Sequence, residues 1–255
     1  MKQLFITATD TDAGKTFVSC AITHALTHQQ TSFDKIETKV AVFKPVSAGC
    51  ENVNGELINE DAKLLCQFAN CQQSIQEINP IAFEDPIAPH IAAKNTGQAI
   101  SVDDIVLHFQ QVKNLEADIT LVEGAGGWRL PLGVEVSNTD NKGKYQFLSD
   151  FAIKEKLKVI LIVNMKLGCL NHAMLTYETI KADGLDCIAW VANCANSDSM
   201  SNLNENIAEL SELLPIPKLA QFDFIPDIDE LGNTITLQDK IQLAAKQVNL
   251  AILNT

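Results

Sequence analysis

The sequence predicts one α/β domain over residues 1–255, with a doubly wound, mostly parallel β-sheet and helices on both faces. Short continuous apolar runs, typical of buried parallel strands, alternate with segments of helical periodicity. This alternation is the pattern of repeated strand–helix–strand units. The chain shows no internal repeat and no clear linker, and with 46% hydrophobic residues it can bury a sizeable core. A single domain therefore accounts for the whole length.

The expected elements follow one another along the chain. Strands are predicted from the apolar runs at 4–6, 40–43, 118–123, 158–163 and 188–193, and a last strand begins within 215–219. Helices are predicted at 15–26, 60–68, 101–115, through 151–153, and at 173–182, 200–214 and 237–252. Residues 79–90 carry three prolines and are expected to form a rigid irregular loop, and the polar stretch 133–146 a mobile excursion.

Charge and cysteine content narrow the function classes. The net charge is −13, and Arg129 is the only arginine, so no basic face for a nucleic acid is expected. The seven cysteines are odd in number and contain no C-x-x-C pair, which favours reduced thiols. The N-terminus shows no signal peptide, and no apolar run approaches membrane-spanning length. We expect a cytoplasmic protein without a membrane partner.

The stretch Phe5–Val18 (F-I-T-A-T-D-T-D-A-G-K-T-F-V) has the order strand, small-residue loop, G-K-T, helix. This is the context of a phosphate-binding loop, in which backbone N–H groups and the helix N-terminus face the phosphates. Lys15 would reach the β- and γ-phosphates, and the Thr16 hydroxyl would ligate Mg²⁺. Ala8 stands where the motif has glycine, which requires a negative φ there. The alternative is an ordinary strand-to-helix turn that contains G-K-T.

Charged residues mark other strand and helix ends. Open α/β sheets bind ligands at the carboxyl ends of their strands, where Lys44 and Glu123 are expected. Glu123 precedes a glycine-rich turn, as a metal-binding acid of a phosphate-loop ATPase would. Asp61 begins a helix, and Asn193 ends a strand, where it could hydrogen-bond a base. The alternatives are a solvated lysine at 44 and capping acids at 61 and 123.

Taken together, the motifs resemble the dethiobiotin synthetase family. The resemblance covers nearly the whole chain up to Asn193 and weakens after Leu219, where A-Q-F-D-F-I replaces the family's G-x-I-P-x-L. The matching motifs are T-A-T-D-T-D-A-G-K-T at 7–16, F-K-P-V-S-A-G at 43–49, N-E-D-A at 59–62, P-I-A-P-H at 86–90, L-V-E-G-A-G-G-W at 121–128, K-L-G-C-L-N-H-A at 166–173 and W-V-A-N at 190–193.

The resemblance implies a P-loop NTPase-like fold and a step of biotin biosynthesis. The implied reaction is the ATP- and Mg²⁺-dependent carboxylation and ring closure of 7,8-diaminopelargonate with CO2, through a carbamate and a carbamic–phosphoric anhydride. It gives dethiobiotin, ADP and phosphate. The implied enzyme is a homodimer with the substrate site at the subunit interface, and the second subunit contributes the helix opening at 168–171 for the substrate carboxylate.

The same resemblance assigns residues to roles. The implied catalytic residues are Lys15, Lys44 and Thr11. The implied metal ligands are Thr16, Asp61 and Glu123. The implied nucleotide-binding residues are Asp12, Ala13, Gly14, Lys15, Thr16, Phe17, Asp61, Glu123, Gly124, Ala125, Gly126, Asn193, Cys194, Asp223 and Phe224. The implied substrate-binding residues are Lys44, Ser47, Ala48, Gly168, Cys169, Leu170 and Asn171. Ala48 stands where the family usually has a hydroxyl residue, with Ser47 one position earlier.

Three other classes of protein compete with this interpretation. A partition or septum-site ATPase would carry an extra lysine at the position of Asp10. A cobyrinate-type amidotransferase would need an additional glutaminase domain, for which the chain is too short. A guanine-specific switch would carry N-K-x-D, which Asn164-Met165-Lys166-Leu167 does not match. The carboxylase hypothesis is therefore favoured.

Overall fold

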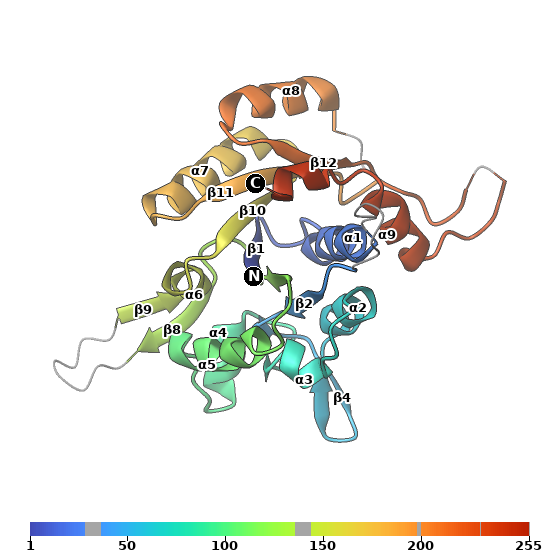
Figure 1. Ribbon diagram of the computed structural model, residues 1–255. Helices are drawn as coiled ribbons and strands as arrows, with labels where there is room; N and C mark the ends of the chain where they lie inside the picture. The colour runs from blue at the N-terminus through green and yellow to red at the C-terminus, as the bar shows by residue number, and fades with distance from the viewer. Residues whose placement is uncertain (29–36, 136–143, 198–199, 230, 255) are drawn as a thin grey trace.

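The computed structural model describes residues 1–28, 37–135, 144–197, 200–229 and 231–254. Its centre is a six-stranded sheet in the order β12-β11-β10-β1-β7-β2, and every neighbouring pair is parallel (Figure 1). The strands are β1 (Lys2–Ala8), β2 (Val40–Phe43), β7 (Ile119–Glu123), β10 (Lys158–Asn164), β11 (Cys187–Asn193) and β12 (Lys218–Phe222). The predicted parallel sheet and α/β class are confirmed.

Helices cover both faces of the sheet, as predicted (Figure 1). One face carries α1 (Lys15–Thr27), α2 (Glu60–Phe68) and α9 (Leu237–Ala245), and the other carries α5 (Val102–Lys113), α6 (Leu148–Lys154), α7 (Cys169–Ala182) and α8 (Leu203–Leu213). Successive strand side chains point to opposite faces. In β1, Leu4 and Ile6 pack in the core under α1, whereas Phe5 packs in the core under α5 and α6.

Several shorter elements lie outside the central sheet and these helices. They are β3 (Val46–Ser47) paired with β6 (Ile81–Ala82), the hairpin β4 (Glu51–Val53) and β5 (Glu56–Ile58), α3 (Ile75–Ile78), α4 (Pro89–Asn95), the hairpin β8 (Pro131–Glu135) and β9 (Lys144–Phe147), and the 3-10 helix η1 (Leu250–Asn254). No helix in the described part of the chain is long and apolar enough to cross a membrane.

Two predicted loops contain regular structure. The interpretation of 79–90 as irregular throughout is wrong, because β6 lies in it and α4 begins at Pro89. Proline fits the first position of a helix, where its missing N–H has no intrahelical partner. The arms of the excursion at 133–146 pair as the antiparallel hairpin β8–β9, and its centre, 136–143, lies outside the described residues.

Several boundaries differ from the prediction for identifiable reasons. Helix α7 begins at Cys169 rather than at residue 173, because Gly168 takes a left-handed conformation (φ 94°) and starts the turn. Helix α9 ends at Ala245 rather than at residue 252, and the Asn249 N–H that follows donates to Leu219 O at 2.9 Å. Strand β12 begins at Lys218, after Pro217, which has no N–H to donate.

Candidate functional site

The loop between β1 and α1 has the backbone that a phosphate-binding loop needs. Gly14 caps α1 with φ 77°, and a Cβ at this position would lie 2.3 Å from Asn193 Nδ2. Asp12 also takes a positive φ, at 54°. Ala8 ends β1 and is not among the described residues with positive φ, so its Cβ is accommodated. The loop therefore forms without the first glycine of the motif.

Lys15 is the first residue of α1, directly after this loop. Its Nζ donates a hydrogen bond to Asp10 O at 3.3 Å. Burial lowers the pKa of the Lys15 ammonium, because a charge is less well solvated there. An anion bound in the loop would restore part of that lost solvation. The position suits the predicted contact with a transferring phosphate.

Lys44, at the end of β2, is enclosed rather than solvated. Only 4% of the residue is exposed, and its Nζ lies 2.6 Å from Glu123 Oε1 and 3.0 Å from Asp61 Oδ2. Burial opposes the charge, but the two carboxylates outweigh burial and raise the pKa of Lys44. For Asp61, burial is likewise outweighed by Lys44, and the pKa falls below its usual value. The alternative of a solvated lysine is wrong.

The neighbouring oxygens fit a magnesium ion. Thr16 Oγ1 donates to Glu123 Oε1 at 2.9 Å, so the three predicted metal ligands meet around Lys44. Glu123 Oε2 is buried and has no hydrogen-bond partner in the described structure. An unpartnered buried carboxylate oxygen is costly and calls for an ion or water. Hydroxyl and carboxylate oxygens are the ligands that Mg²⁺ prefers.

These groups open into one hollow with a volume of ≈ 670 Å³. Its floor holds Lys15, Lys44 and Glu123, and its walls come from the phosphate loop, the turn after β7 and the start of α4. It is lined by Thr11, Asp12, Gly14, Lys15, Thr16, Phe17, Lys44, Ser47, Ala48, Asn59, Asp61, Pro86, Ile87, Ala88, Pro89, Glu123, Ala125, Gly126 and Leu130. All three predicted metal ligands, most of the phosphate loop and three of the seven predicted substrate residues therefore share one space.

A second hollow of ≈ 310 Å³ adjoins the other side of the phosphate loop. Both hollows share Asp12, Gly14 and Phe17. The second one is lined in addition by the predicted Asn193, Cys194, Asp223 and Phe224, and by Ala195, Ile225, Leu237 and Lys240. Asn193 Nδ2 donates to Ala13 O at 2.8 Å, which fixes the side chain against the loop. The arrangement places a nucleoside-sized space beside the phosphate loop.

Some predicted residues have other contacts. The Ser47 hydroxyl donates to Asn79 Oδ1 at 2.6 Å, although Ser47 also lines the hollow. Ala13 is buried beneath the loop, and Gly124 is close-packed, since a Cβ there would lie 3.1 Å from Ile6 O. The turn 168–171 lines neither hollow. Cys169 is buried, and the preceding Leu167 is 94% exposed.

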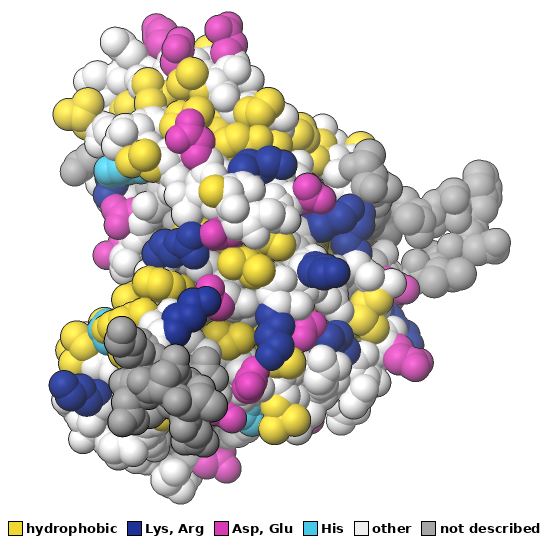
Figure 2. Space-filling model, turned by 90° about the vertical axis from the view of Figure 1, so that its left-hand side faces the viewer, with side chains coloured by type: hydrophobic (Ala, Val, Ile, Leu, Met, Phe, Trp, Pro, Cys, Tyr) yellow, Lys and Arg dark blue, Asp and Glu magenta, His cyan; other side chains and the backbone are white. Residues whose placement is uncertain are grey.

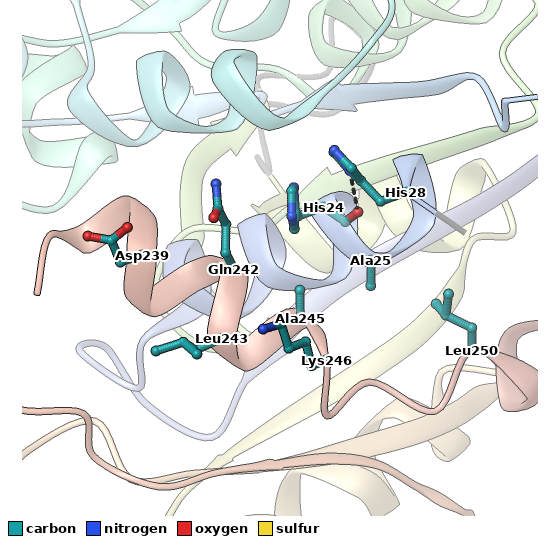
Figure 3. A pocket seen from close by; sticks show the side chains of 9 residues that line it. All are labelled: His24, Ala25, His28, Asp239, Gln242, Leu243, Ala245, Lys246 and Leu250. Carbon is teal, nitrogen blue, oxygen red and sulfur yellow. Dashed lines mark hydrogen bonds between the residues drawn. The ribbon is translucent and has the colours of Figure 1, made fainter. Parts of the chain in front are cut away.

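Sequence reasoning missed several lining residues. Asn59 opens the N-E-D-A motif, but no contact of its own was predicted for it, and Leu237 and Lys240 come from a predicted helix that was given no role. Leu237 and Lys240 belong to no recognised motif. A third hollow of ≈ 560 Å³ lies between α1 and α9, lined by residues such as His24, His28 and Lys246 (Figure 3). It contains none of the predicted site residues.

Sequence comparisons match most of this chain to known proteins. A family model described as "AAA domain" matches residues 2–231. The chain is 43% identical over 233 residues to the ATP-dependent dethiobiotin synthetase BioD of Alteromonas mediterranea, covering 90% of this chain and 95% of that protein. It is 41% identical over 246 residues to the BioD of Vibrio vulnificus, covering 95% and 100%.

Solved structures agree on the fold. The MinC:MinD cell division protein complex of Aquifex aeolicus matches with a TM-score of 0.57 and 13% identity, covering 100% of this chain and 97% of that chain. MinD from the same organism matches with a TM-score of 0.54. At such low identity, these likenesses show the architecture alone. From the sequence relatives, the chain belongs to the dethiobiotin synthetase family.

Proposed function

We propose that this protein forms dethiobiotin in biotin biosynthesis, using 7,8-diaminopelargonate, CO2 and ATP. Its relatives are named for this ATP-dependent synthesis. The observation that carries the proposal is the meeting of Lys15, Lys44 and Glu123 in one hollow beneath a phosphate loop. Two cationic side chains at that point suit a reaction between two anions.

The chemistry proceeds in three steps. An amine nitrogen of the substrate attacks the carbon of CO2 and loses a proton, which gives a carbamate anion. A carbamate oxygen attacks the γ-phosphorus of ATP, and the bond to the β–γ bridging oxygen breaks to release ADP. The second amine attacks the carbonyl carbon of the mixed anhydride, phosphate leaves, and the ureido ring closes with loss of a proton.

The chain's own part is positioning and charge compensation. Lys15 would contact the transferring phosphate, and Lys44 would hold the carbamate against it. Both ammonium groups offset the repulsion between carbamate and triphosphate. Thr16, Asp61 and Glu123 would hold Mg²⁺, which when bound supplies further charge compensation on the phosphates. Thr11 lines the same hollow and would orient the phosphate end.

The adjoining hollow would take the nucleoside of ATP. The Asn193 amide NH2 is engaged with Ala13 O, so its side-chain oxygen is the group free to accept a hydrogen bond. An acceptor suits the exocyclic amino group of adenine. The neighbouring Asp223 carboxylate is also an acceptor, and Phe224 offers an aromatic ring for stacking. These groups support ATP as the nucleotide.

Phosphate release from ATP in the presence of bicarbonate and Mg²⁺ tests the proposed function. We expect release only when 7,8-diaminopelargonate is added, with one phosphate formed per dethiobiotin. Phosphate release that does not depend on the diamine would favour a nucleotide-driven switch of the same fold. The ion pair of Asp10 with Lys166 argues against such a switch, since the switch lysine would stand at Asp10.

A homodimer would complete the substrate site. Leu167 beside the α7 N-terminus and Leu175 on α7 are exposed apolar residues, as are Val134 and Tyr145 of the β8–β9 hairpin. The side of the molecule on the left of Figure 1, where α7 and the hairpin lie, shows hydrophobic side chains among charged ones (Figure 2). The backbone amides at 168–171 would bind the substrate carboxylate of the partner's site.

Mixing two inactive variants tests this composite site. Asn171→Asp places a negative charge in the first turn of α7, which favours the helix but repels a substrate carboxylate. We expect Asn171→Asp and Lys15→Ala each to be inactive alone. After exchange of subunits, the mixture should regain about a quarter of the wild-type rate, because half of randomly assorted dimers carry one intact site. No recovery, or a monomer by sedimentation, would contradict the shared site.

The seven cysteines are all free thiols in the structure. Free thiols persist where the surroundings are reducing. We therefore propose the cytoplasm as the compartment in which the protein works. Burial raises the pKa of several of these thiols, and that of Cys187 to about 12, so they stay protonated and unreactive.

A further inference from the structure

The segment that covers the nucleoside hollow is held from a distant helix. Residues 223–226 follow β12 and belong to no helix or strand, yet Asp223, Phe224 and Ile225 line the hollow. Lys240 of α9 reaches this segment. Its Nζ donates to Ile225 O at 2.6 Å and to Asp227 Oδ1 at 2.7 Å, and lies 5.7 Å from the centroid of the Phe224 ring.

These contacts differ in their exposure to water. The Lys240 side chain is only 13% exposed, whereas that of Asp227 is 89% exposed. A hydrogen bond from a shielded ammonium to a backbone carbonyl is stronger than a neutral one, while the exposed ion pair is screened and weaker. The cation above the Phe224 ring adds a further attraction. Lys240 therefore restrains an otherwise irregular segment through three different groups.

Lys240 lies on a helix that is capped at its N-terminus and packed into the core. Helix α9 begins with a capping box in which the Thr236 hydroxyl accepts from the Asp239 N–H, and the Asp239 carboxylate accepts from the Thr236 N–H. Buried Ile241, next in the chain, packs in the same core cluster as Val18 of α1. Because α1 begins at the phosphate loop, the loop and the covering segment are connected through α1, α9 and Lys240.

We propose that Lys240 is a positioning residue that holds Phe224 and Ile225 over the base of the bound nucleotide. The proposal rests on the proposed function for the location of that nucleotide. Lys240 lies beyond the residues 2–231 that match the family model, and the segment it holds departs from the family's motif. Phe224 is 43% exposed and lines the hollow, so a purine can stack on its ring.

The affinity of the Lys240→Met variant for the nucleotide tests this role. We expect the dissociation constant for a fluorescent ATP analogue, and the KM for ATP, to rise about tenfold, as the loss of one charge-assisted hydrogen bond produces. Turnover at saturating ATP should stay within about twofold, because Lys240 touches no reacting atom. Lys240→Arg should recover most of the affinity. The matched control is Lys246→Met, at the C-cap of the same helix and lining the α1–α9 hollow (Figure 3), which should bind normally.

Asp227→Ala separates positioning from direct contact with the nucleotide. Asp227 does not line the nucleoside hollow, and its exposure makes a folding defect a minor concern. We expect a smaller rise in the dissociation constant, about twofold to threefold. Combined with Lys240→Met, it should add nothing, since the shared contact is already lost.

The possible outcomes distinguish failure of this inference from failure of the proposed function on which it rests. Normal ATP affinity in folded Lys240→Met, or an unchanged affinity in Asp227→Ala, would overturn the positioning role while the wild-type protein still binds ATP. If Lys240→Met does not fold, the Asp227→Ala result decides. A wild-type protein that binds no ATP analogue would instead refute the proposed function.

Discussion

Lys15→Ala is expected to lower ATP-dependent dethiobiotin formation by about a thousandfold, the scale for losing a preorganised group that stabilises transition-state charge. The side chain stands at the phosphate loop, and among the described residues Lys44 is the one other lysine that lines the same hollow. The transferring phosphoryl group would therefore lose one of two cationic partners. The rate of dethiobiotin formation at saturating ATP, measured with purified protein, gives the effect.

The fold should survive this change. Lys15 makes one long hydrogen bond, to Asp10 O, and burial already disfavours its charge. We expect circular dichroism and thermal unfolding to match those of the wild type. Lys181→Ala, an exposed position in the last turn of α7, serves as the control and should keep full activity. Retained turnover in Lys15→Ala would remove Lys15 from the reaction.

Lys44→Met is expected to abolish turnover and also to lower the free energy of unfolding by about 3–5 kcal/mol. Glu123 is fully buried, and Lys44 Nζ is its ammonium partner at 2.6 Å. Methionine fills a similar volume but leaves the Glu123 charge uncompensated in a poorly solvated place. Urea unfolding in the absence of metal measures the loss of stability, and the product assay measures the loss of turnover.

The double variant Lys44→Met/Glu123→Gln separates the two effects. Removing both charges should recover most of the stability, because the buried carboxylate is gone. Turnover should stay absent, since neither the carbamate partner nor the Glu123 metal ligand remains. If the Lys44→Met variant were as stable as the wild type, the importance of the buried Lys44–Glu123 ion pair would be contradicted. An active double variant would contradict both assigned roles.

The proximity of Lys44 and Glu123 could be predicted from the sequence. Each follows an apolar run, and parallel strands end at one edge of a sheet. β2 and β7 are indeed neighbours, with Phe43 opposite Val122, so the residues that follow are brought together. The phosphate loop could also be predicted, because its strand, turn and helix are contiguous in the chain.

Other features depend on contacts that no local pattern records. The hydrogen bond from Asn193 to Ala13 spans 180 positions, and the burial of Lys44 depends on how Asp61 and Glu123 pack around it. After α9 ends, the Asn249 N–H donates to Leu219 O, a contact between residues far apart in the chain. The β8–β9 arms pair across a polar stretch whose apolar periodicity is weak.

By itself, the sequence determined the α/β class with its parallel sheet, the alternation of strands and helices along the chain, and the phosphate loop with Lys15 and Thr16. These follow from hydrophobic periodicity and from glycine positions, which act between near neighbours in the chain. Only the tertiary structure decided that Lys44 is a buried partner of two carboxylates and that Lys240 reaches the Phe224 segment. Such partners are selected by strand order and by the packing of α9 on α1, which no local pattern specifies.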